Sequence, residues 1–176
     1  MKMDAGKHKL FFMALSLLCL LHAPLLVYAQ DKAADPKALS YLQYHQEAAK
    51  IDEKAHTVNL DQFLDLMNKK NTVIVDLRTP AEYEYEHIKG AIQFGADISK
   101  EKLEKLIPAK DTTILLYCSY SLEPTRMIAL TNVSLPQFIL QGYPNTYKLG
   151  PIWESKGSWQ DSEKEINRLL MVKKGP

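Results

Sequence analysis

The chain has 176 residues, of which 22 are basic and 21 acidic, so its formal net charge is only +1. A charge this close to zero argues against a surface for nucleic acid or for anionic membranes. The length, without an internal repeat or a low-complexity segment, suits one domain with a full hydrophobic core.

Residues 1–29 have the pattern of a secretory signal peptide. Three lysines precede an apolar stretch at residues 10–21, and Val27 and Ala29 are small residues at the two positions that a signal peptidase reads. The stretch is short for a membrane span, and the large Leu18 before Cys19 argues against a lipoprotein site. We therefore expect cleavage after Ala29 and export, with the periplasm favoured over secretion and no stable membrane span in the mature chain.

Residues 30–55 are predicted to form an N-terminal helical extension. Asp35 is a suitable helix cap and Pro36 suits the first helical position, so we expect a helix over residues 35–54. Its apolar face is thin, which favours an extension that docks on the main domain, residues 56–176. That domain begins with a short strand near His56 and a helix over residues 60–68, whose apolar residues share one face.

The rest of the chain alternates between strands and helices. The predicted strands are residues 72–77, 91–94, 113–117 and 145–149, and the first of them, rich in β-branched residues, is predicted to be central. The predicted helices are residues 79–85 and 101–106, one that starts at Pro124, and residues 163–172. This alternation predicts an α/β fold of three layers, with a parallel sheet covered by helices on both faces.

Cys118 is the only cysteine that remains after the predicted signal, which excludes an internal disulfide. It follows directly after the apolar run at residues 113–117. Open parallel sheets place their functional residues beyond the carboxyl ends of their strands, and Cys118 stands at such an end. On its own, however, a lone cysteine is better interpreted as a buried structural residue.

Four blocks in order make the prediction more specific. Their sequences are VIVDLRTPAEY at 73–83, HIKGA at 87–91, ILLYC at 114–118 and GYPNTYKL at 142–149, followed by Trp153. Together they resemble a single rhodanese domain that covers about residues 57–157. The resemblance implies a five-stranded parallel α/β domain whose loop cysteine carries a persulfide during sulfur transfer.

The segment after Cys118 is the predicted active loop. If Pro124 is at the first helical position, free backbone N–H groups near the thiol favour the thiolate and bind an oxyanionic donor. Arg126 would add a positive charge, although it lies eight residues after the cysteine instead of the five common in the family. The nearby Glu123 opposes thiolate formation. The predicted site comprises Cys118 as the catalytic residue and, as donor-binding loop residues, Ser119, Tyr120, Ser121, Leu122, Glu123, Thr125 and Arg126.

The other polar residues of the motifs are interpreted mainly as structural. Asp76 and Arg78 resemble the family pair that supports the active loop through buried polar contacts. His87 belongs to a turn in the matching block, and the acidic residues that alternate with tyrosines are predicted to form a solvated face. The acidic residues of this face are Glu82, Glu84 and Glu86. Trp153 and Trp159 are predicted to pack against the domain.

No cofactor is expected, and the spacing of the three histidines of the mature chain does not suggest a metal site. Three functions are consistent with these patterns. The first is an exported sulfurtransferase that moves a sulfane sulfur from a small donor such as thiosulfate to cyanide or a thiol. The second is a catalytically weak rhodanese-like module that binds a protein partner. The third, a cysteine phosphatase or arsenate reductase, needs cysteine and arginine six residues apart and ranks last.

Overall fold

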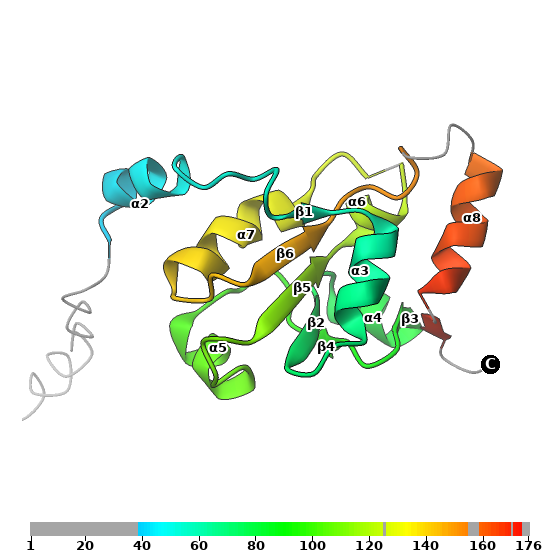
Figure 1. The fold of residues 1–176 in the computed structure, drawn as a ribbon, viewed down its shortest axis with the longest axis horizontal. Helices are drawn as coiled ribbons and strands as arrows, with labels where there is room; N and C mark the ends of the chain where they lie inside the picture. The colour runs from blue at the N-terminus through cyan, green and yellow to red at the C-terminus, as the bar shows by residue number, and fades with distance from the viewer. Residues whose placement is uncertain (1–38, 125, 155–158, 170, 174–176) are drawn as a thin grey trace, which may run out of the picture. The chain divides into compact units, whose positions relative to one another are not determined.

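The computed structural model describes residues 39–124, 126–154, 159–169 and 171–173 (Figure 1). The predicted signal peptide and the predicted cap at Asp35 lie outside these residues. From Tyr41 onward the chain forms one unit, and only this unit is described below. Among the described residues, no helix combines the length and apolar character that a membrane crossing requires.

Five parallel strands form the central sheet. They are β1 (Thr57–Val58), β2 (Thr72–Asp76), β4 (Ile92–Gln93), β5 (Thr113–Tyr117) and β6 (Thr146–Leu149), arranged in the order β1-β6-β5-β2-β4. The predicted five-stranded parallel sheet is therefore confirmed. The middle position belongs to β5, whose last four residues are buried, while β2 lies beside it as an interior strand.

Helices cover both faces of this sheet, as Figure 1 shows. Leu60 and Phe63 of α3 (Leu60–Met67) pack into the core on one face. Leu103 of α5 (Lys100–Leu106) and Phe138 of α7 (Leu130–Leu140) pack into the core on the other. The other helices in the described part of the chain are α2 (Tyr41–Ala48), α4 (Pro80–Tyr85), α6 (Ser119–Leu122) and α8 (Trp159–Arg168).

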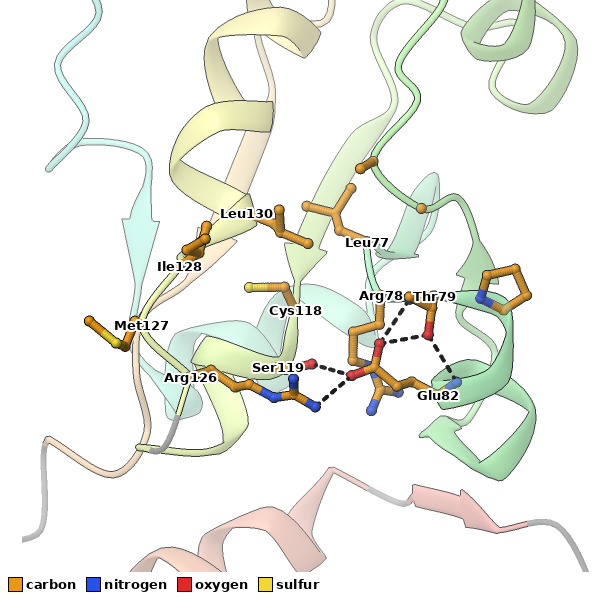
Figure 2. Close-up of a pocket in the computed structure, with 13 residues that line it drawn as sticks. Leu77, Arg78, Thr79, Glu82, Cys118, Ser119, Arg126, Met127, Ile128 and Leu130 are labelled. Carbon is orange, nitrogen blue, oxygen red and sulfur yellow. Dashed lines mark hydrogen bonds and ion pairs between the residues drawn. The ribbon is translucent and has the colours of Figure 1, made fainter.

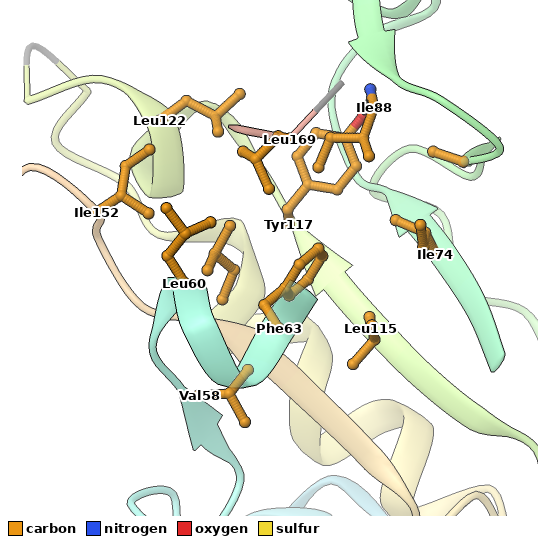
Figure 3. Close-up of a cluster of buried hydrophobic side chains, with 12 residues drawn as sticks. Val58, Leu60, Phe63, Ile74, Ile88, Leu115, Tyr117, Leu122, Ile152 and Leu169 are labelled. Carbon is orange, nitrogen blue, oxygen red and sulfur yellow. Dashed lines mark hydrogen bonds between the residues drawn. The ribbon is translucent and has the colours of Figure 1, made fainter. Parts of the chain in front are cut away.

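Successive residues of β5 point into different cores. Leu115 and Tyr117 belong to the cluster under α3, which Figure 3 shows with Phe63 beside them. Ile114, Leu116 and Cys118 belong to the cluster on the other face. This is the two-residue periodicity of a strand that is buried on both sides. Cys118 therefore lies on the face of the sheet opposite Tyr117.

Local signals set several helix ends. Thr79 caps α4 through a capping box with Glu82, and Pro80 occupies the first turn, as the sequence predicts. Asn59 and Gln62 form the same motif at the start of α3. After α7, Gly142 adopts a φ of +92°, the left-handed conformation that commonly ends a helix.

Two predicted helices have different boundaries. The predicted helix over residues 35–54 is wrong on both sides of α2, because residues 39 and 40 are not helical and turns follow Ala48. The helix predicted over residues 163–172 is also wrong there, because α8 ends at Arg168. Residues Met171–Lys173 form β7, which pairs antiparallel with β3 (Glu86–Ile88) in a second, two-stranded sheet. This long-range pairing takes precedence over the local helical pattern.

The predicted helix start at Pro124 is wrong as well. One turn of helix, α6, comes immediately after Cys118, and α7 begins only at Leu130. Ser121 anchors this turn, since its hydroxyl group donates to the Leu149 carbonyl (3.0 Å) and its own carbonyl accepts from Ile152 N (3.1 Å). Glu123 is then extended, as is usual for a residue before proline.

We expect Phe63→Ala to lower the free energy of unfolding by about 3–5 kcal/mol, because it leaves a cavity in a fully buried site. The measurement is chemical denaturation monitored by circular dichroism. Leu42→Ala is the control, because Leu42 is 66% exposed on α2, and we expect it to change this free energy by less than about 1 kcal/mol. Equal losses in the two variants would contradict the assignment of the core.

Candidate active site

Cys118 is presented at the carboxyl end of β5, where the strand gives way to α6. It is a free cysteine, and the residue is only 1% exposed. It nevertheless lines a pocket of about 620 Å³, which opens beyond the ends of β2 and β5. This is the location that the sequence predicts for a reactive group in a parallel sheet.

Beneath the pocket, a buried polar network joins the ends of β2 and β5. Asp76 accepts hydrogen bonds from Arg78 Nε (3.0 Å) and Nη2 (2.7 Å), and also from the Tyr117 hydroxyl group. The Tyr117 oxygen in turn accepts from Ile88 N (3.2 Å). Asp76 and Tyr117 are fully buried and Arg78 is nearly so. The residue that precedes Cys118 is thus fixed by hydrogen bonds to its neighbours.

The protonation states in this network follow from burial and charge. Burial, together with the negative charge of Asp76, raises the pKa of the Tyr117 phenol well above its usual value. Burial alone would lower the pKa of Arg78, but its hydrogen bonds to Asp76 and the charge of that carboxylate raise the pKa overall. Tyr117 therefore remains a neutral donor and Arg78 a cation at neutral pH.

Glu82 organises the polar side of the pocket (Figure 2). One of its carboxylate oxygens accepts from the Ser119 hydroxyl group (2.9 Å) and from Arg126 Nη2 (3.1 Å). The other accepts from Thr79 N (3.0 Å) and from the Thr79 hydroxyl group (2.7 Å). Burial on its own would raise the pKa of Glu82, but these hydrogen bonds and the charge of Arg126 lower it. Glu82 is thus a carboxylate at neutral pH.

The predicted solvated face is therefore wrong for two of its three residues. Glu82 lines the pocket, and Glu86 is in β3, where it pairs with Lys173 of β7 (3.7 Å). Glu84 is exposed. The sequence analysis did not place Glu82 at the pocket, although the Thr79-to-Glu82 spacing of a capping box indicated that its side chain turns back toward the chain.

The predicted loop residues divide between the pocket and the core. Ser119 and Arg126 line the pocket together with Cys118. Ser121 and Leu122 are buried instead, with Leu122 in the hydrophobic cluster under α3 (Figure 3). Thr125 lies outside the described residues. Glu123 is exposed, with Oε2 at 3.9 Å from Arg126 Nε.

Trp153 and His87, which were predicted to have structural roles, make packing contacts and hydrogen-bond contacts with neighbouring residues. Trp153 donates from Nε1 to the Tyr120 carbonyl (3.0 Å), and the two rings meet edge to face. The ring of His87 stacks on Tyr83 and its Nδ1 is 2.8 Å from the Tyr83 carbonyl. These four residues are absent from the lining of the Cys118 pocket.

The side of the pocket opposite Glu82 is apolar. Figure 2 shows the Cys118 side chain between this wall and the polar group formed by Ser119, Glu82 and Arg126. Met127 is 95% exposed and Ile128 is 70% exposed, so both apolar side chains reach solvent at the pocket. The wall comprises Leu77, Met127, Ile128 and Leu130.

This arrangement suits nucleophilic chemistry by the Cys118 sulfur. A cysteine at the end of a rigid strand, in a pocket with a charged and an apolar side, can form a covalent bond with a small ligand. Among the described residues, no cluster of three histidine, cysteine, aspartate or glutamate side chains is suited to hold a metal ion.

Comparisons with known proteins identify a known kind of domain in this chain. A family model described as a rhodanese-like domain matches residues 59–150. Over 45 residues, the chain is 36% identical to the thiosulfate sulfurtransferase PspE of Escherichia coli (strain K12), which is 26% of this chain and 43% of that protein. Over 66 residues, it is 30% identical to a tRNA uridine(34) hydroxylase of Buchnera aphidicola, which is 35% of this chain and 20% of that enzyme.

These alignments span less than half of either curated relative. Among solved structures, a crystal structure of the Alr3790 protein from Anabaena sp. superposes with a TM-score of 0.45. A solution structure of the rhodanese-like domain of that protein superposes with a TM-score of 0.46. The solution structure is 15% identical, and the match covers 58% of this chain and 76% of that one.

We expect Tyr117→Phe to lower the free energy of unfolding by about 1–3 kcal/mol, because it leaves the buried Asp76 carboxylate and the Ile88 N–H short of a partner. Tyr85→Phe, at a position that is 71% exposed, is the matched control and should change this free energy by less than about 0.5 kcal/mol. Denaturant unfolding of the three proteins measures the difference. If Tyr117→Phe leaves the free energy of unfolding unchanged, the hydrogen bonds of Tyr117 do not hold the strand ends together.

Proposed function

The chain belongs to the rhodanese-like domain family, and from this membership we propose that it is a sulfurtransferase that carries sulfane sulfur as a persulfide on Cys118. The observation that carries the proposal is the position of Cys118, a free thiol at the end of β5 that lines the pocket. The E. coli relative is named a thiosulfate sulfurtransferase, which makes thiosulfate the first donor to test.

The proposed reaction has two displacement steps. In the first, the Cys118 thiolate attacks the outer sulfur of thiosulfate, the S–S bond of the donor breaks, and sulfite leaves with the bonding electron pair. Cys118 then carries a persulfide. In the second, cyanide or a thiolate attacks the outer sulfur of this persulfide, which returns the Cys118 thiolate and yields thiocyanate or a new persulfide. No outside oxidant or reductant is needed.

The other site residues would position the thiol and the donor. Asp76 and Arg78 would keep the end of β5 in place through Tyr117. Ser119 and Arg126 would contact the donor, since both line the pocket with the thiol. Arg126 is already paired with Glu82, so a donor oxyanion would have to share its guanidinium group.

A binding module without efficient chemistry is the second candidate. The low exposure of Cys118 and the pairing of Arg126 with two carboxylates favour it, because both features weaken the capture of a small anion. The apolar side chains of Met127 and Ile128 would then contact a protein partner. Formation of a persulfide separates the two candidates.

Export to the periplasm is part of the proposal and rests on the sequence pattern of residues 1–29. We expect the protein recovered from the periplasm of an expressing cell to begin at Gln30. Intact mass spectrometry of that fraction tests the cleavage site. An unprocessed chain confined to the cytoplasm would contradict the export proposal without affecting the chemistry.

We expect the purified protein to gain one sulfur atom, about 32 Da, when it is incubated with thiosulfate, and to lose that mass on reduction. Cys118→Ser should fold normally and gain no mass. Intact mass spectrometry of both proteins, before and after the donor and the reductant, makes the measurement. If Cys118→Ser also gains a reducible sulfur, the mechanism is overturned. If the folded, unmodified protein has a free Cys118 thiol that accepts no sulfur from any donor, the binding module is favoured.

A further inference from the structure

The charge of Arg126 is already compensated before any donor arrives. Its guanidinium group lies 3.1 Å from Glu82 and 3.9 Å from Glu123. Glu82 is itself held in place, because it also accepts from Ser119 and twice from Thr79. Arg126 is therefore paired with a carboxylate that other donors hold in place.

The second guanidinium group that lines the pocket is also neutralised. Arg78 pairs with the buried Asp76 at 2.7 Å. The two guanidinium groups of the pocket lining are thus paired with three carboxylates, those of Asp76, Glu82 and Glu123. A dianion that enters this site must either displace Glu82 from Arg126 or remain beside uncompensated negative charge, and both raise its free energy of binding.

The opposite wall offers a different kind of contact. Leu77, Ile128 and Leu130 line it, together with the thioether of Met127, which is almost fully exposed. A small apolar group on the donor would lose water-exposed area against these side chains, and this burial favours binding. The pocket therefore combines repulsion of a doubly charged ligand with attraction of an apolar one.

We propose that Glu82 determines donor specificity by neutralising Arg126, so that the site prefers a singly charged sulfane donor with an apolar substituent, of the organic thiosulfonate class, over dianionic thiosulfate. The inference rests on the proposed function. The Cys118 thiolate attacks the outer sulfur of the thiosulfonate, the S–S bond breaks, and a sulfinate leaves with the bonding electron pair. The outer sulfur remains on Cys118 as the persulfide, so atoms and electrons balance.

Methanethiosulfonate and thiosulfate form a matched pair of probes, because a methyl group in one replaces a charged oxygen in the other. The quantity to measure is the rate constant of persulfide formation on Cys118 at low donor concentration, followed by intact mass spectrometry. We expect a methanethiosulfonate-to-thiosulfate ratio above one in the unmodified protein. In Glu82→Gln, which keeps the acceptor of the capping box, we expect the ratio to fall by roughly fivefold.

Two further variants make the test specific. Glu104 lies on α5, outside the pocket, and forms a surface ion pair with Lys110, so Glu104→Gln removes a carboxylate there and should leave the ratio unchanged. Arg126→Gln should raise the ratio, because it leaves the negative charges of Glu82 and Glu123 uncompensated. This rise is opposite to the fall expected in Glu82→Gln, and it tests the inference even if Glu82→Gln does not fold. Damage to the fold would slow both donors together and would not change their ratio.

Ionic strength provides an independent readout. Added salt should speed the reaction of the unmodified protein with thiosulfate, because salt screens repulsion, and this acceleration should be smaller in Glu82→Gln. A donor ratio that is the same in Glu82→Gln and the unmodified protein would overturn the inference while leaving a Cys118 persulfide intact. The absence of a persulfide with either donor would overturn the proposed function together with it.

Discussion

The buried carboxylate of Asp76 is the constraint on which the site depends. A charge with no access to water costs several kcal/mol unless partners satisfy it, and here Arg78 and Tyr117 do so. Because Asp76 and Arg78 belong to the end of β2 and Tyr117 to the end of β5, separating the two strands would take the Tyr117 donor away from the buried carboxylate. The position of Cys118, the next residue after Tyr117, follows directly from this pairing.

The strand periodicity then turns this structural network into a support for chemistry. Tyr117 and Cys118 are neighbours in sequence but face opposite sides of the sheet, one in the core under α3 and the other at the pocket. The thiol thus has a rigid base without occupying space in the network. Reactive groups on such rigid elements keep their geometry better than groups on long loops.

The sequence predicted what local patterns determine and failed where distant contacts decide. The apolar run before Cys118 and the cap at Thr79 were sufficient to place β5 and α4. The helix expected at Pro124 was wrong because the burial of Ser121 and Leu122 fixes a helical turn earlier in the chain. The pairing of β3 with β7 joins residues more than 80 positions apart, which no local pattern reveals.

Glu82 illustrates how one residue links folding and selectivity. One oxygen of its carboxylate completes the cap of α4, and the other oxygen accepts from Ser119 and Arg126 across the pocket. The negative charge of Glu82, which the cap of α4 holds in place, therefore also acts on a ligand that enters the pocket. An arginine eight residues after the cysteine can remain beside such a carboxylate, and the resulting ion pair leaves its guanidinium group without a free positive charge to attract a dianion. The selectivity of the pocket would then arise at contact, where a donor must compete with Glu82 for the guanidinium group.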